Sequence, residues 1–199
     1  MAKGHIIWLY GVSSSGKSSL TKELQKILSE PYFCIGQDTF TDIIAPCLSG
    51  YFNGIDSDTL WYRAVDAMYH TIKTYSDMGL NVIVDHVVLN QDDGKEQALF
   101  DSCIKEIKDY PITLVKVVCS LEELRRREKS RGDRDIGNAE WQVKQGLYPF
   151  DGYDVVVDTN TMSLLECAAN IQEGFKENQA NYDKTNVTWN SSSIETGIG

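Results

Sequence analysis

One short stretch, from Gly11 to Ser18, constrains the fold of this chain more than any other. It has the spacing G-x-x-x-x-G-K-S, and it lies between an apolar run, residues 5–10, and an amphipathic segment, residues 18–28. Glycines at 11 and 16 allow the backbone to wrap tightly, so that successive N–H groups point inward toward an anion. A helix that starts beside them adds the positive end of its dipole. A serine-rich β-turn could match the spacing by chance, but the strand before it and the helix after it favour a phosphate-binding loop.

The residues of this stretch, called the P-loop below, have distinct expected roles. Lys17 is expected to reach the β- and γ-phosphates of a nucleoside triphosphate, and the hydroxyl of Ser18 is expected to ligate Mg²⁺. The residues expected to hold the nucleotide are Gly11, Val12, Ser13, Ser14, Ser15, Gly16, Lys17, Ser18 and Ser19. Nucleotide binding is therefore the working hypothesis.

Short apolar runs alternate with amphipathic segments along the rest of the chain. The apolar runs predict strands, the second of them buried, at residues 5–10, 32–36, 82–85, 112–118 and 155–157. The amphipathic segments predict helices at residues 18–28, 58–78, 92–109, 121–129, 138–147 and 162–176. This alternation predicts an α/β protein of the three-layer P-loop NTPase fold, in which a parallel sheet of about five strands has helices on both faces. The ligand should bind beyond the carboxyl ends of the strands.

A single domain over residues 1–176 accounts for these elements. Residues 41–56 contain Pro46 and two glycines and show no regular pattern. Residues 177–199 are rich in Asn, Ser and Thr and lose the helical periodicity, which predicts a flexible or loosely docked tail.

Two carboxylates are expected at the ends of strands beside the P-loop. Asp38 follows the second strand, where it could accept the proton of an attacking hydroxyl or start a helix as its N-cap. Asp85 ends the third strand, where it could orient Mg²⁺ as a Walker B acid does or cap the strand end. The expected metal ligands are therefore Ser18 and Asp85. His86 could touch a substrate or make a structural hydrogen bond.

A basic stretch at residues 125–134 combines a helix face with a segment interrupted by glycine. The helical half could be a solvated face on which glutamates such as Glu128 form ion pairs at i,i+4 spacing. That account does not explain Arg131 and Arg134, which lie on either side of Gly-Asp. In an acidic protein that has a P-loop, they indicate an arginine-bearing lid at about residues 128–140 over the triphosphate.

Composition restricts the partners and the location. The net charge of −10 argues against a general nucleic-acid or anionic-membrane surface, because either would be repelled. No apolar run approaches the ~20 residues of a membrane span, and the first strand follows the N-terminus without a signal peptide, so we expect a cytoplasmic protein. The five cysteines form no C-x-x-C pair, which favours buried free thiols over a catalytic cysteine. We expect a small molecule as partner and leave a homo-oligomer open.

Together these motifs resemble the chloramphenicol phosphotransferase family of P-loop kinases, in order from about Ile6 to Ile171. The resemblance rests on the P-loop with its serine run, on the two strand-end acids and on three further motifs. The motifs are R-E-x-x-R-G-D-R at 127–134, G-x-A-x-x-Q at 137–142 and Y-D-x-x-V-D-T at 153–159.

The resemblance implies ATP-dependent, Mg²⁺-assisted phosphorylation of a hydroxyl group on a small molecule. Chloramphenicol is the substrate after which the family is named. Phosphorylation of the 3-hydroxyl of such an antibiotic would give resistance to it. The family's general base matches Asp38, its catalytic arginine matches Arg134 and its P-loop lysine matches Lys17. Arg127 and Arg131 are then expected to help bind the nucleotide.

The chain departs from the family pattern in several places. It lacks the Val-His pair that usually follows the glutamine of the second motif, and it has His86 where the family often has a second Asp. Residues 41–62 resemble nothing in detail, although in this fold they would line the acceptor pocket. A core role is equally open for Trp61. The candidate acceptor residues are Tyr51, Phe52, Trp61, Tyr62 and His86.

Two other functions stay open. A kinase for nucleosides or nucleotide sugars that resembles the zeta-toxin group would share the P-loop and the strand-end acid. A regulator that binds ATP and hydrolyses it slowly would need no base for an acceptor hydroxyl, so Asp38 argues against it.

Overall fold

The computed structural model describes residues 2–44, 56–90, 93–131, 136–149 and 152–192. Within those residues, five strands form one parallel sheet in the order β2-β3-β1-β4-β5. The strands are β1 (Ile6–Tyr10), β2 (Tyr32–Gly36), β3 (Asn81–His86), β4 (Ile112–Val118) and β5 (Val155–Asp158). The predicted α/β fold with a parallel sheet is confirmed.

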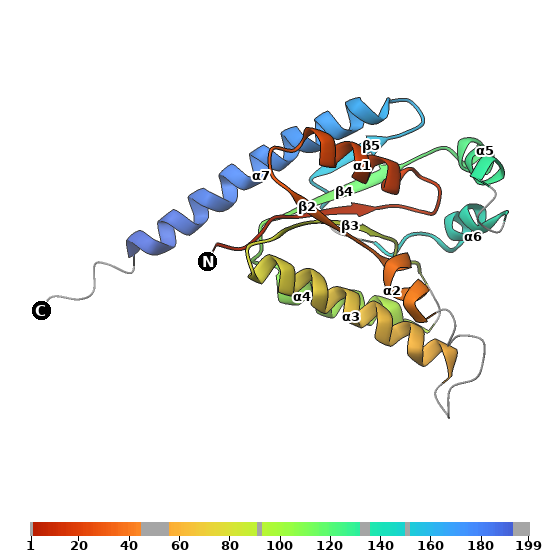
Figure 1. Ribbon diagram of the computed structural model, residues 1–199, viewed down its shortest axis with the longest axis horizontal. Coiled ribbons are helices and arrows are strands. Elements are labelled where there is room, and N and C mark those ends of the chain that lie inside the picture. Colours follow the sequence, from red (N-terminus) through yellow and green to blue (C-terminus); the bar gives the residue numbers. More distant parts are fainter. Residues whose placement is uncertain (1, 45–55, 91–92, 132–135, 150–151, 193–199) are drawn as a thin grey trace, which may run out of the picture.

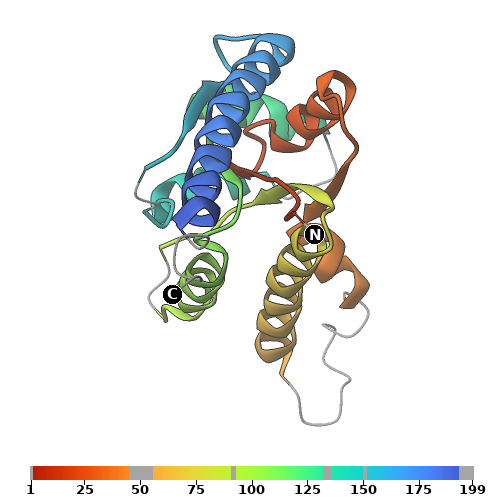
Figure 2. The same ribbon diagram turned by 90° about the vertical axis from the view of Figure 1, so that its left-hand side faces the viewer.

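Helices cover both faces of the sheet (Figure 1). α1 (Lys17–Ile27) and α7 (Leu164–Ser192) pack together on one face, and α3 (Ser57–Asp77) and α4 (Lys95–Ile107) pack together on the other. Figure 2 shows these two pairs on opposite sides of the sheet. The remaining described helices lie toward the carboxyl ends of the strands: α2 (Gln37–Ile44), α5 (Leu121–Arg131) and α6 (Asn138–Gln145).

The central strand β1 is buried along its whole length. Side chains alternate along a strand, so Ile6, Trp8 and Tyr10 face the α3–α4 layer. Ile7 and Leu9 face the α1–α7 layer. A strand covered by helices on both faces is apolar at every position, which is why its sequence is a continuous apolar run. The P-loop therefore starts from the best-packed strand of the sheet.

The prediction that β2 is a buried strand is wrong. β2 is an edge strand, in which Phe33 is 45% exposed and Cys34 is exposed. An apolar run predicts a strand without telling where in the sheet the strand will lie. Cys103 and Cys167 are buried free thiols, as predicted. Cys34 is a free thiol too, but it is exposed, so the expectation of burial is wrong at this position.

Two helices extend into segments that were expected to lack regular structure. α2 includes residues 41–44, and α7 continues through residues 177–192. Residues 177–192 contain neither proline nor glycine, so no residue of the segment breaks a helix that has already formed. The extension also contacts the sheet, because Nδ2 of Asn178 lies 3.5 Å from Oγ1 of Thr113 in β4. None of the described helices is both long and apolar enough to cross a bilayer.

Candidate active site

A cleft of about 940 Å³ opens at the carboxyl ends of the strands. The P-loop, the start of α2, the end of β3 and the helices α5 and α6 all contribute to its walls. Ligands of open α/β sheets bind at this end, and the volume is in the range of cofactor and drug-sized ligand sites. The cleft is therefore the candidate active site.

The shape of the P-loop depends on backbone positions that ordinary side chains tolerate poorly. A Cβ atom on Gly11 would lie 2.5 Å from the carbonyl oxygen of Val117, so only glycine fits there. Gly16 has a φ angle of 100°, and Ser14 has a φ angle of 62° although it is not glycine. A left-handed non-glycine residue costs about 1–3 kcal/mol and persists only where its surroundings hold it. Neighbouring elements must therefore hold the loop in this conformation.

Side chains from α5 and from the end of β5 hold the carbonyl groups of the loop. The hydroxyl of Thr159 donates to the carbonyl oxygen of Ser15 at 2.6 Å. The guanidinium of Arg127 donates to the hydroxyl of Thr159 at 3.0 Å and to its carbonyl oxygen at 2.8 Å. It also donates to the carbonyl oxygen of Ser15 at 3.3 Å, while its Nε donates to Glu123 at 2.8 Å. Arg127 lines the cleft and donates hydrogen bonds to the P-loop backbone. Its contact with a nucleotide stays a prediction.

Lys17, Ser18 and Asp85 form a small polar cluster at the start of α1. Nζ of Lys17 donates to the carbonyl oxygens of Gly11 at 2.8 Å and Val12 at 3.1 Å, and it lies 3.5 Å from Oδ1 of Asp85. The hydroxyl of Ser18 donates to Oδ2 of Asp85 at 2.7 Å. The structure thus brings together three residues that the sequence predicts to act on the phosphates and the metal.

The paired oxygens of Ser18 and Asp85 fit Mg²⁺. This ion prefers oxygen ligands, keeps several waters and is usually held by one or two protein groups together with substrate phosphates. Among the residues that the structure describes, no group of three His, Cys, Asp or Glu side chains could hold a metal ion. A site that relies on phosphate oxygens as well as on these two side chains agrees with that finding.

Asp38 lines the same cleft from the first turn of α2. In the parallel pairing of β2 with β3, Gly36 lies opposite Asp85, and Asp38 follows Gly36 by two residues. The positive end of the helix dipole favours a carboxylate at this position. The interpretation of Asp38 as an N-cap is wrong, because α2 begins at Gln37 and Asp38 is its second residue. The carboxylate lines the cleft beside the P-loop, and its role as a base stays a prediction.

His86 occupies the position of a structural hydrogen-bonding residue, one of its two predicted roles. It is 1% exposed, its Nε2 lies 2.9 Å from the hydroxyl of Tyr69, and its ring stacks on Tyr69 and Trp8. Burial, together with the nearby charge of Lys17, lowers the pKa of His86 to about 3, so the ring is neutral. A direct contact with an acceptor stays a prediction.

The described candidates on α3 lie away from the cleft walls. Trp61 packs against the apolar cluster between the sheet and the α3–α4 layer, which is the core role left open for it. The hydroxyl of Tyr62 donates to Asp93 at 3.0 Å. Arg131 is the last residue of α5. The remaining predicted site residues lie outside the described residues: Tyr51, Phe52 and Arg134. Cys47, one of the five cysteines, lies outside them as well.

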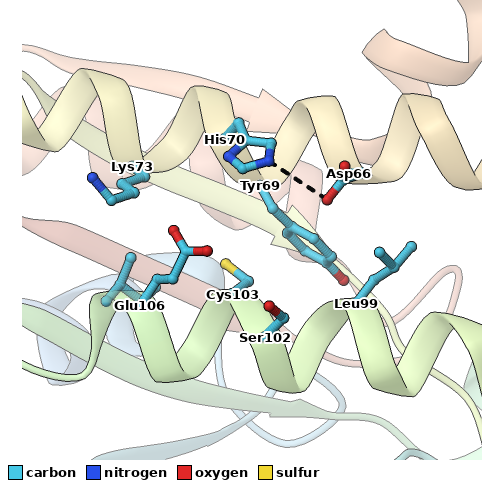
Figure 3. A pocket seen from close by; sticks show the side chains of 9 residues that line it. Asp66, Tyr69, His70, Lys73, Leu99, Ser102, Cys103 and Glu106 are labelled. Carbon is cyan, nitrogen blue, oxygen red and sulfur yellow. Dashed lines mark ion pairs between the residues drawn. The ribbon is translucent and has the colours of Figure 1, made fainter.

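A second cavity lies between α3 and α4 and shares no lining residue with the cleft (Figure 3). Its volume is about 60 Å³, which is room for about two water molecules at about 30 Å³ each. Asp66 and His70 lie 3.8 Å apart at its rim, and Cys103 points toward it from α4. Burial raises the pKa of Cys103 to about 12, which keeps its thiol protonated and unreactive. The cavity is too small for a metabolite.

Comparison with known protein families assigns the chain to one of them. The family model described as chloramphenicol phosphotransferase-like protein matches residues 4–176. The chain belongs to the chloramphenicol phosphotransferase-like family. The resemblance predicted from the motifs is thereby confirmed.

Relatives of this phosphotransferase-like chain agree with that classification. A Mycobacterium tuberculosis protein of strain H37Rv, named "Putative O-phosphotransferase Rv2636", is 28% identical over 198 residues, covering 88% of this chain and 84% of its own. The solved structure of the M. tuberculosis APS kinase CysC in complex with AMPPNP and APS has a TM-score of 0.64 at 16% identity and covers 88% of this chain and 99% of its own. A gluconokinase from Sinorhizobium meliloti 1021 has a TM-score of 0.59 at 17% identity, with coverages of 92% and 98%. At these identities the two structures show the fold, which is that of P-loop kinases.

Three residues within the motifs of this phosphotransferase-like chain make contacts at or near the P-loop that the sequence did not reveal. Glu128 was expected on a solvated helix face, which is wrong, because it is 1% exposed. Its carboxylate accepts hydrogen bonds from the backbone N–H groups of Gly137 at 3.0 Å and Ala139 at 2.6 Å. Gln142 and Thr159 contact the P-loop backbone, although no role was predicted for either. Their occurrence within the quoted motifs was the available signal, and only the fold brings them to these partners.

Proposed function

We propose that this phosphotransferase is a kinase that transfers the γ-phosphoryl group of ATP to a hydroxyl group of a small molecule. The observation that carries the proposal is the presence of Asp38 in the same cleft as the P-loop and Asp85. A phosphate cradle needs no second carboxylate beside it, whereas transfer to a hydroxyl needs a group that accepts its proton.

In the proposed reaction, the carboxylate of Asp38 takes the proton of the acceptor hydroxyl as the oxygen attacks the γ-phosphorus. The new P–O bond forms as the bond to the bridging oxygen breaks, and ADP leaves. The ammonium group of Lys17 supplies positive charge beside the transferred group, and the loop N–H groups orient the phosphates. When bound, Mg²⁺ would neutralise phosphate charge, with Ser18 and Asp85 as its protein ligands. Such chemistry depends mainly on positioning and electrostatics, so few residues need take part.

The arginines at 131 and 134 are proposed to act from a lid at about residues 128–140. A guanidinium group over the triphosphate would stabilise the charge of the transition state, a contribution of about 10³-fold or more in related reactions. Arg134 is the proposed catalytic arginine, and Arg127 and Arg131 are proposed to support nucleotide binding.

The proposed acceptor is a chloramphenicol-like antibiotic, phosphorylated at its 3-hydroxyl. The family match supports this choice, whereas the absence of the Val-His pair and the presence of His86 leave room for another hydroxylated compound. A nucleoside or nucleotide-sugar kinase, and an ATP-binding regulator, are therefore included as outcomes of the test.

The deciding experiment is an acceptor screen with the full chain, Mg²⁺ and ATP, followed by ADP release and by mass spectrometry of the acceptor. Chloramphenicol, nucleosides, nucleotide sugars and simple sugars form the panel. ADP release that depends on chloramphenicol, with a product heavier by one phosphoryl group, supports the proposal. A nucleoside or nucleotide-sugar product would replace the acceptor, and ADP release independent of every acceptor would favour the regulator.

A further inference from the structure

Gln142, on the second turn of α6, binds the backbone of the P-loop directly. Its Oε1 accepts a hydrogen bond from the backbone N–H of Ser13 at 2.6 Å. Gln142 is 9% exposed and Ser13 is 4% exposed, so water competes little for this bond. The acceptor therefore reaches the loop from a helix that is far away in sequence.

The bonded N–H lies next to the strained position of the loop. Ser14 follows Ser13 and has a left-handed backbone, with a φ angle of 62°. On the other side of Ser14, the carbonyl oxygen of Ser15 accepts hydrogen bonds from Thr159 and Arg127. Side chains thus hold the backbone on both sides of Ser14, with Gln142 acting from α6 and Arg127 acting from α5. A loop held in this way keeps its shape before any phosphate arrives.

The position of Gln142 depends in turn on Glu128. The buried carboxylate of Glu128 accepts from the N–H of Gly137, the N-cap residue of α6, and from the N–H of Ala139 in its first turn. The N-cap residue itself makes no side-chain hydrogen bond to the helix. Ala139 also packs with Val12 of the P-loop and with Leu124 of α5. A continuous chain of contacts therefore runs from α5 through α6 to the loop.

We propose that Gln142 is a positioning residue that holds Ser13 so that the P-loop is preformed for phosphate, and that Glu128 acts on phosphate binding through Gln142. The inference rests on the proposed nucleotide site but concerns residues to which that proposal assigns no role. It couples the placement of the α5–α6 pair to the affinity of the loop for phosphates.

The test uses two separate variants, Gln142→Met and, as the matched control, Gln145→Met at an exposed position of the same helix. Methionine keeps the side-chain length and removes the acceptor oxygen. One hydrogen bond of this kind changes an equilibrium by roughly 2- to 13-fold. We expect Gln142→Met to weaken Mg·ADP and Mg·ATP by about 3- to 10-fold in calorimetric titrations, and Gln145→Met to leave both unchanged. We also expect the Ser13 amide of nucleotide-free Gln142→Met to exchange with deuterium faster, while the amides of β1 keep their protection.

A double-mutant cycle tests the coupling. Glu128→Gln keeps one acceptor oxygen and should weaken nucleotide binding in the wild-type background, but should add little when Gln142 is already methionine. Additive effects of the two substitutions would overturn the role of Glu128. Should Gln142→Met not fold, Gln142→Ala replaces it in both measurements.

The outcomes separate the inference from the proposed function. If the wild type binds neither Mg·ADP nor Mg·ATP, the nucleotide proposal fails, and faster exchange at Ser13 would still support the hydrogen bond. If the wild type binds both while Gln142→Met binds equally well and exchanges at the same rate, only the inference fails.

Discussion

Asp38 and Asp85 follow neighbouring strands and have different surroundings. Asp85 accepts from Ser18 and lies 3.5 Å from the ammonium group of Lys17, so its carboxylate is already engaged beside the P-loop. Asp38 stands on the first turn of α2 and lines the same cleft. Asp85 is the proposed metal ligand, and Asp38 is the proposed acceptor of the proton from the incoming hydroxyl.

Replacing Asp38 by asparagine removes the proton acceptor and keeps the size of the side chain. We expect the turnover rate to fall by about 10²- to 10⁴-fold, the usual range for loss of a general base. The dissociation constant of Mg·ATP should change by less than about twofold, because nucleotide binding is proposed to depend on other residues. Steady-state kinetics with the acceptor found in the screen, together with calorimetry, measure both.

Asp42→Asn on the same helix is the control, because Asp42 is exposed and does not line the cleft. It should keep the wild-type rate. Turnover retained in Asp38→Asn would remove Asp38 as the base.

Lys17 is 8% exposed and is held on the loop carbonyls, so its charge is fixed beside the phosphate cradle. Lys17→Ala should weaken ATP binding and should lower the rate by about 10²-fold or more, since removal of a single preorganised donor has an effect of this size. Lys26→Ala, at the exposed end of α1, is the control. An unchanged rate in Lys17→Ala would contradict the role proposed for the ammonium group.

At the scale of elements, the sequence predicts what depends on local pattern and misses what depends on tertiary neighbours. The alternation of strands and helices and the strand–loop–helix of the P-loop follow from periodicity and glycine spacing, and both are confirmed. The burial of Glu128 could not be predicted, because a glutamate between charged residues looks solvated until α6 is folded against it. The edge position of β2 likewise depends on packing rather than on local composition.

α4 contains a titratable group whose surroundings affect stability. Glu96 is 2% exposed in the first turn of this helix, and burial, with a smaller contribution from Asp93, raises its pKa to about 7. Above its ordinary pKa near 4.5 the unfolded chain releases this proton while the native state keeps it. Native stability is therefore expected to fall as the pH rises from about 4.5 through 7, by about 3 kcal/mol in total at about 1.4 kcal/mol per pKa unit.

Glu96→Gln should remove this pH dependence, because the amide stays neutral. We expect the variant to exceed the wild type in free energy of unfolding at pH 8 and to differ much less at pH 5, as measured by urea denaturation. Glu106→Gln, at an exposed position of α4, should follow the wild type at both values. Equal pH dependence in Glu96→Gln and the wild type would show that Glu96 does not carry the effect.

At the scale of the whole molecule, the structure describes the residues around the P-loop in more detail than the expected acceptor pocket. The described residues around the P-loop form a connected set that includes Lys17, Ser18, Asp85, Thr159 and Gln142. The family match covers residues 4–176, and the fold is that of P-loop kinases. The acceptor pocket was expected along residues 41–62, in which the sequence resembles nothing in detail, so the identity of the acceptor must come from the screen.

Nucleotide binding should stabilise the whole fold. If Ser18 and Asp85 bind Mg²⁺, the stabilisation should depend on the metal. A ligand at 100 times its dissociation constant stabilises the native state by about 2.7 kcal/mol, which raises the Tm of a chain of this size by roughly 5–10 °C. We expect ATP with Mg²⁺ to raise the Tm by more than ATP with EDTA, because Ser18 and Asp85 contribute only when the ion is bound. In Asp85→Asn, which keeps the side-chain size but not its charge, the difference between the two conditions should shrink toward zero. A difference as large as that of the wild type would show that Mg²⁺ reaches the triphosphate without Asp85, and Asp85 would then be left with its contacts to Ser18 and Lys17.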